Sequence, residues 1–63
     1  MGDDSTTVKF HDYEEQQEGF FVVRKFGDRL SLAFSLEKNG DFEALIDRRA
    51  AEELVEAIQK AIR

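Results

Sequence analysis

Few residues in this sequence could do chemistry. The single histidine, His11, is followed directly by Asp12. Neighbouring side chains in a strand point to opposite faces, so these two would not act together on a substrate. Ser5, Ser31 and Ser35 lack the sharp strand-to-helix turn that exposes a nucleophilic serine. We therefore predict no catalytic residue and expect the protein not to be an enzyme.

Patterns that bind phosphate or metal are also missing. Gly19, Gly27 and Gly40 stand apart as single turn glycines and form no Gly-rich phosphate loop. The chain has no cysteine, and one histidine near a few loop carboxylates offers poor coordination geometry. A chain this short also has little material for a deep pocket. We predict no metal site, no cofactor and no small-molecule substrate.

The length predicts one small domain of marginal stability. A chain of 63 residues buries only about 60% of the surface that it exposes when unfolded. Without disulfides or a metal, stability must come from good packing or from self-association. No apolar run approaches the roughly 18 residues that cross a bilayer, and the first residues do not resemble a signal peptide. We expect a cytoplasmic protein without a membrane partner.

The net charge of −5 is concentrated near the N-terminus. Residues 1–18 carry six acids and one base, whereas residues 19–63 carry eight acids and eight bases. We predict that residues 1–5 form a disordered acidic N-terminus and that residues 6–63 form a single ββββα domain. The acidic arm either aids solubility or imitates phosphates and occupies a basic site on another protein, as an inhibitor would.

Alternating apolar residues predict an α+β fold with an antiparallel β-meander of three to four strands. The alternation is clearest between Leu30 and Leu36. A two-residue Gly27-Asp28 turn of type II′ is expected to join the second and third strands. The expected strands are residues 6–11, 20–26, 29–37 and 41–47, and the alternation does not fix where the first of them would pair.

Strand register follows from matching apolar side chains across each hairpin, because a slip of one residue moves every side chain to the other face. The Gly27-Asp28 turn pairs Phe21 with Phe34 and Val23 with Leu32. For the next hairpin, a three-residue loop, Lys38-Asn39-Gly40 with Gly40 left-handed, pairs Leu36 with Phe42, Phe34 with Ala44 and Leu32 with Ile46. This choice keeps apolar residues opposite apolar residues.

A helix is expected over residues 48–62, with Asp47 as its N-cap. Ala51, Leu54, Val55, Ile58 and Ile62 fall on one stripe at helical spacing. We predict that this stripe packs on the sheet face that carries Phe21, Leu32 and Phe34.

The opposite sheet face keeps large apolar groups that one helix cannot cover. An exposed patch of this kind usually marks an interaction surface. We therefore predict a small protein-interaction module whose partner is another protein chain, in the first place itself, bound through this face or through an edge strand. The N-terminal arm, docking Val8, Phe10 or Tyr13 there, is the alternative cover. The predicted interface residues are Phe20, Val22, Phe26, Ala33 and Leu45.

A basic cluster near the Gly27-Asp28 turn suggests a second possible partner. Its residues are Arg24, Lys25, Arg29 and Arg48, joined by Arg49. Aromatic groups beside cations on a sheet are typical of single-stranded nucleic-acid binding. The order of four strands and one helix over residues 6–63 also resembles the ββββα unit of the Pur-repeat single-strand binders, in topology only. The net negative charge opposes this alternative, which we rank below self-association.

Overall fold

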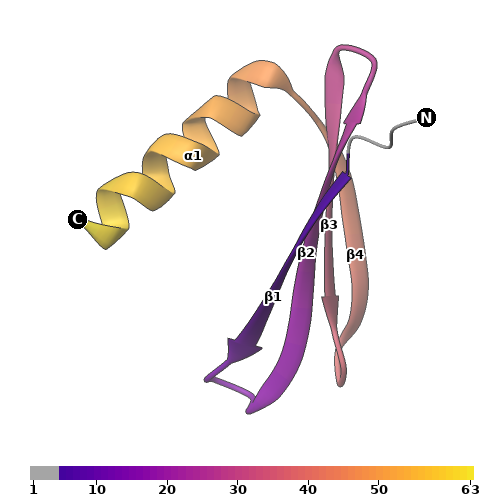
Figure 1. Ribbon diagram of the computed structural model, residues 1–63, viewed down its shortest axis with the longest axis vertical. Helices are drawn as coiled ribbons and strands as arrows, with labels where there is room; N and C mark the ends of the chain where they lie inside the picture. Colours follow the sequence, from indigo (N-terminus) through magenta and orange to yellow (C-terminus); the bar gives the residue numbers. More distant parts are fainter. Residues whose placement is uncertain (1–4) are drawn as a thin grey trace.

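The computed structural model describes residues 5–63, and it contains the four antiparallel strands and single C-terminal helix that the sequence predicts (Figure 1). The strands follow one another in a meander, in the order β1-β2-β3-β4. The fold class is therefore confirmed as α+β. The bounds are β1 (Ser5–Asp12), β2 (Gln17–Phe26), β3 (Arg29–Leu36), β4 (Gly40–Asp47) and α1 (Arg48–Ile62).

The first predicted strand exists and lies at the edge of the sheet. β1 pairs antiparallel with β2, placing Val8 opposite Phe21 and Phe10 opposite Gly19. Of the segment predicted to be disordered, residues 1–4 lie outside the described residues, and Ser5 is the first residue of β1. No helix within residues 5–63 is long and apolar enough to cross a membrane.

The hairpin between β2 and β3 has the predicted register. Phe21 lies opposite Phe34 and Val23 opposite Leu32. Gly27 has a φ of 66°, and Asp28 does not share this left-handed conformation. A positive φ at the first of the two turn residues alone is the mark of a type II′ turn, so the turn chemistry is also confirmed.

The predicted register between β3 and β4 is wrong by two residues. Phe34 lies opposite Phe42 rather than Ala44, and Leu36 lies opposite Gly40. The loop is therefore Glu37 to Asn39, although Gly40 does have the predicted left-handed conformation, with a φ of 90°. A shift of two residues leaves every side chain on its predicted face.

A buried glutamine in β2 explains the observed loop. Gln17, only 2% exposed, accepts a hydrogen bond from the Lys38 backbone nitrogen (2.8 Å) and donates to Asn39 Oδ1 (2.7 Å) and Asp12 Oδ2 (2.9 Å). The Glu37 nitrogen also donates to the Glu18 carbonyl (3.2 Å). These bonds come from a strand that is not part of the hairpin, so pairing arguments within the hairpin could not include them.

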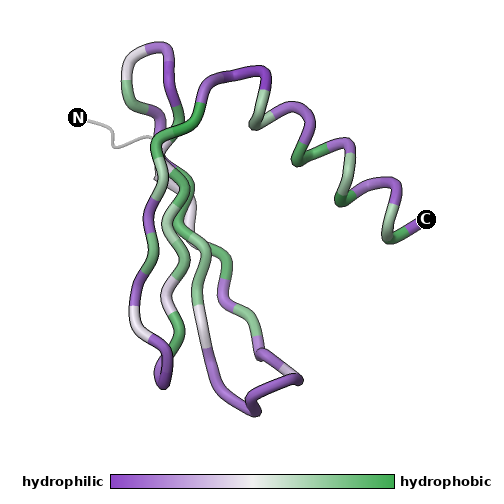
Figure 2. The backbone as a smooth tube through the Cα atoms, turned by 180° about the vertical axis from the view of Figure 1, so that it is seen from behind, coloured by the Kyte–Doolittle hydropathy of each residue, from purple (hydrophilic) through white to green (hydrophobic). Residues whose placement is uncertain are grey.

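The helix begins where predicted but only partly covers the sheet. Asp47 is its N-cap and accepts a hydrogen bond from the Ala50 nitrogen at 2.9 Å. The helix axis then diverges from the strands, so that its C-terminal end stands far from the sheet (Figure 1). Coloured by hydropathy, the helix has apolar and polar residues in every turn along its whole length (Figure 2). Between the helix and the sheet lies an open, wedge-shaped space, which we call the wedge.

The open wedge makes the molecule less compact than its size predicts. The Cα radius of gyration is 12.8 Å, whereas about 10.6 Å is expected for a compact domain of this length. The accessible surface is 5338 Å², against about 4,200 Å² for a compact monomer of this mass. Among residues 5–63 no hydrophobic side chain is fully buried.

Candidate interaction surfaces

Side-chain alternation gives the sheet two faces, which we define by their residues. The inner face looks toward α1 and carries Val8, Phe10, Phe21, Val23, Leu30, Leu32, Phe34, Leu36, Phe42, Ala44 and Ile46. The outer face carries Phe20, Val22, Arg24, Phe26, Ser31, Ala33, Ser35, Glu43 and Leu45. Both faces follow the predicted parity, because the β3–β4 shift is an even number of residues.

A row of four phenylalanine rings crosses the inner face, with one ring from each strand. Ring centroids lie 4.7 Å apart for Phe10 and Phe21, 5.2 Å for Phe21 and Phe34, and 5.9 Å for Phe34 and Phe42. These spacings are those of favourable aromatic contacts. Phe21 is nevertheless 39% and Phe42 55% exposed. The rings therefore contact one another along the sheet, but the helix does not cover them fully.

Gly19 lets the row begin at the edge strand. A Cβ atom at this position would lie 2.6 Å from the ring of Phe10 and 2.7 Å from the carbonyl oxygen of Ser35. Glycine is therefore required here for close approach of the ring to the backbone. Phe10 can cross β2 and reach Phe21 and Phe34 only because this residue has no side chain.

The apolar stripe of α1 forms the second wall of a cleft. We call cleft the hollow lined by Phe21, Leu32, Phe34, Phe42 and Ala44 of the inner face and by Leu54 of the helix. Ala51 is half-buried beside the sheet, but Leu54 is 42%, Ile58 52% and Ile62 78% exposed. Val55 of the same stripe is 55% exposed, and exposure is greatest at Ile62, so the cleft is most open toward the helix C-terminus.

The direct junction between β4 and α1 holds this cleft open. Asp47 is both the last strand residue, opposite Arg29, and the helix N-cap. Its backbone is extended, with a φ of −86° and a ψ of 171°. Connections that fold a helix back onto a sheet usually contain about 2–6 residues. Here no residue is available to reverse the chain direction.

The predicted interface residues all lie on the outer face, where two of them are half-buried. Phe20 is 42%, Phe26 61% and Leu45 55% exposed, while Val22 and Ala33 are half-buried. From Ser5 onward the N-terminal arm does not cover this face, because Val8 and Phe10 point to the inner face and Tyr13 lies in the β1–β2 turn. The outer face thus keeps the open apolar patch that the sequence indicates.

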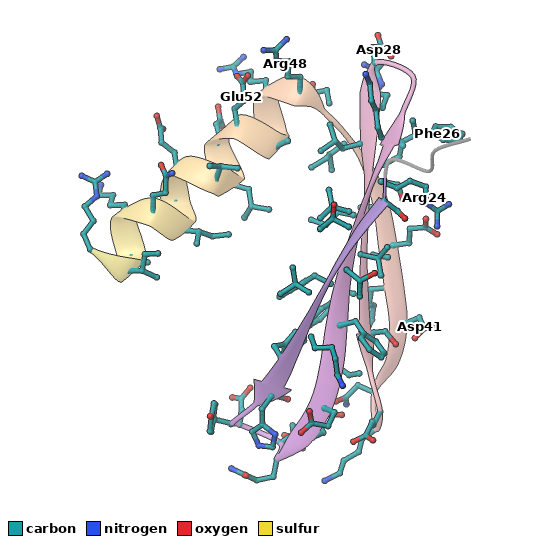
Figure 3. The ribbon with its side chains drawn as sticks, in the orientation of Figure 1. Arg24, Phe26, Asp28, Asp41, Arg48 and Glu52 are labelled. Carbon is teal, nitrogen blue, oxygen red and sulfur yellow. The ribbon has the colours of Figure 1, made fainter. Side chains whose placement is uncertain are left out.

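The predicted basic residues are divided between two hollows. Arg24 shares a hollow on the outer face with Phe26, Ser31, Glu43 and Leu45, and Figure 3 shows Arg24 and Phe26 on the side of the sheet away from the helix. Lys25, Arg29 and Arg48 line a second hollow at the β2–β3 turn. Arg48 also pairs with Glu52 at 2.8 Å, in the i,i+4 geometry expected from the sequence.

The far end of the sheet is acidic and tightly hydrogen-bonded. We call acidic end the part of the sheet formed by the β1–β2 and β3–β4 turns and the strand residues beside them, which carries Asp12, Glu14, Glu15, Glu18, Glu37 and Asp41. Here His11 Nδ1 lies 2.8 Å from Glu18 Oε2, and His11 Nε2 lies 3.3 Å from Gln16 Oε1. Gln16 uses its amide nitrogen on the Tyr13 carbonyl (2.7 Å), so its oxygen is free to accept from the histidine.

This arrangement shifts two titrations in opposite directions. Because both ring nitrogens of His11 face acceptors, the bonds to Glu18 and then Gln16 raise the pKa of His11 above 6.5. The hydrogen bond from Gln17, helped by the backbone N–H groups of Glu14 and Glu15, lowers the pKa of Asp12 below 3.8. Within residues 5–63, no three His, Asp or Glu side chains gather as a metal site would require.

Sequence reasoning did not predict that the inner face stays open. It assigned Phe21, Phe34 and Phe42 to a core sealed by the helix stripe. The available signal was that the last strand and the helix share Asp47, which leaves no loop for closure.

Comparisons with known proteins give no relative for this chain. No protein-family model matches it, and neither do curated proteins or solved structures.

Proposed function

We propose that this protein is a small non-enzymatic protein-interaction module that associates with itself. The observation that supports this proposal is the cleft, whose two apolar walls face each other without touching over most of their length. Burying one side chain of the size of Phe, Leu or Ile stabilises a protein by about 1.5–3 kcal/mol. An isolated chain gives up much of this stabilisation, and an associated one would recover it.

The amount of excess surface fits an interface between chains. The accessible surface of 5338 Å² exceeds the compact-monomer expectation by about 1,100 Å². Obligate homodimers bury about 2,000–5,000 Å² in total, or about 1,000–2,500 Å² from each chain. The surplus per chain is therefore of the size that one partner of a stable dimer contributes.

Sedimentation velocity over a range of protein concentrations tests the proposal. We expect wild type to be a dimer or larger at micromolar concentration, and Ile58→Asp to be monomeric because it places a charge on the exposed stripe. Phe20→Asp makes the matched change on the outer face and should stay associated.

The outcomes distinguish the surfaces. Dissociation by Phe20→Asp but not by Ile58→Asp would assign the interface to the outer face and its predicted residues. A wild-type monomer at high micromolar concentration would refute self-association.

A second candidate function is single-stranded nucleic-acid binding on the outer face. It is favoured by Arg24 and Phe26 lining one hollow, a pairing of cation and aromatic ring suited to a phosphate and a base. Fluorescence anisotropy with short oligonucleotides at two salt concentrations tests it. Absence of binding at low salt, where phosphate contacts are strongest, would end this candidate.

A further inference from the structure

We infer that the ligand of the open cleft is the C-terminal half of α1 from a second copy of this chain, docked so that the two clefts face each other. This inference rests on the proposed self-association and adds its geometry. Each copy would contribute an inner face and a helix stripe to one shared core, while both outer faces remain on the surface.

The first step is that a chain cannot fill its own cleft. The helix direction is fixed by Asp47, which is held on one side by the β-ladder and on the other by its N-cap bond to Ala50. On the apolar stripe, Ala51 is half-buried and Leu54 lines the cleft together with residues of the sheet. Ile58 and Ile62 are 52% and 78% exposed, and the C-terminal end of the helix stands away from the sheet (Figure 1). Closing the wedge would require the extended backbone at Asp47 to change its φ and ψ.

The second step is the shape and chemistry of the hollow that continues the cleft at the acidic end. Its floor is apolar, formed by Phe10, Phe21, Phe34 and Leu36, and its rim is acidic, formed by Asp12, Glu14 and Glu15. A ligand for such a hollow needs an apolar surface flanked by positive charge.

The end of α1 has that composition. Its last turns carry Ile58 and Ile62 on the apolar stripe, with Lys60 in the last turn and Arg63 as the C-cap. Within one chain, the acidic end lies at the opposite end of the sheet from the start of α1. The chain therefore does not bring its own helix end and its own acidic end together (Figure 1).

The third step is symmetry. A two-fold axis across the mouths of two clefts places each helix end against the acidic end of the other copy. The same contact is then made twice, as in an isologous dimer. Both apolar stripes keep facing inward, and the charged outer side of α1, including the Arg48–Glu52 and Arg49–Glu53 pairs, stays in solvent.

Cysteine crosslinking tests this geometry, because the natural chain has no cysteine. Ile62→Cys and Tyr13→Cys, at positions 78% and 80% exposed, would be purified separately, mixed, and treated with a short bismaleimide. We expect a covalent heterodimer of the two variants, identified by mass. The matched control is Ile62→Cys mixed with Phe26→Cys, an exposed aromatic position on the outer face, which should lose this product.

A double variant, Ile62→Cys with Tyr13→Cys, separates docking between copies from closure of one chain. Docking between copies yields a covalent dimer, whereas an intrachain link yields a compact monomer and would overturn the inference. Crosslinking that favours Phe26→Cys would also overturn it while leaving self-association intact. If sedimentation shows no dimer at all, the proposed function itself fails.

Discussion

The acidic end and the cleft differ in how fully their side chains find partners within one chain. At the acidic end, buried Gln17 uses both its oxygen and its amide nitrogen, and the turns that it joins are held from two sides. In the cleft, the phenylalanine row and the helix stripe are both ordered, but neither finds enough apolar partner surface.

The contrast teaches which interactions a chain of this size can complete alone. Hydrogen bonds are short and directional, and two neighbouring turns can satisfy them. Apolar burial needs area on both sides, and a single 15-residue helix that diverges from the sheet cannot provide it. One chain therefore satisfies the hydrogen bonds of the acidic end, whereas it leaves the apolar walls of the cleft partly exposed.

Replacing Gln17 should have the largest effect on the polar end. Gln17→Leu removes the acceptor of the Lys38 nitrogen and the donor to Asp12 and Asn39. Leaving buried polar groups unsatisfied costs about 1–3 kcal/mol each, so we expect a loss of about 3 kcal/mol in the free energy of unfolding. Urea denaturation at fixed protein concentration measures this loss.

Gln59→Leu is the matched control for that experiment. Gln59 lies exposed on the helix, and an exposed substitution of this kind usually changes stability by less than about 0.5 kcal/mol. Equal losses in the free energy of unfolding for the two variants would mean that the hydrogen bonds of Gln17 add no stability. The contrast between the acidic end and the cleft would then disappear.

If the cleft binds a second copy, the free energy of unfolding should depend on protein concentration. Unfolding that also dissociates a dimer becomes harder by about 1.4 kcal/mol for each tenfold increase in chain concentration. We expect this slope for wild type in urea melts at different protein concentrations. Ile58→Asp should remove the slope, whereas Gln17→Leu should lower stability and keep it.

A wild-type stability that does not change with concentration would contradict this prediction. It would mean that the exposed stripe and the phenylalanine row contribute no association energy.

The smallest expected effect is the pH dependence of the β1–β2 turn. His11 has a raised pKa, so its stabilisation is complete below 6.5 and is lost as the pH rises through the folded-state value. Asp12 has a lowered pKa, so its stabilisation is present above 3.8 and is lost as the pH falls through the folded-state value. The turn should be most stable between these two limits.

Proton NMR of the His11 ring measures the first of these shifts directly. Glu18→Gln replaces the carboxylate that faces Nδ1 and should bring the pKa of His11 back toward 6.5. A wild-type His11 that titrates below 6.5 would show that the ring does not donate to Glu18 in solution.

Much of the fold could be predicted because its signals are local. Alternation placed the strands and both faces, Gly27-Asp28 fixed one hairpin, and Asp47 marked the helix start. The β3–β4 register could not be predicted in the same way, because Gln17 binds Lys38 and Asn39 from about twenty residues away in sequence. The outer-face residues Phe20, Phe26 and Leu45 were found by parity, but the inner face was taken for a sealed core.

The sequence by itself determined which side chains share a face, since alternation depends only on backbone period. It also determined that Ala51, Leu54, Val55, Ile58 and Ile62 form one stripe. Only the tertiary structure decided whether the stripe and the inner face meet. The direction of the helix depends on the cap geometry at Asp47 and on the strand that precedes it, and that direction keeps two apolar surfaces apart within one chain.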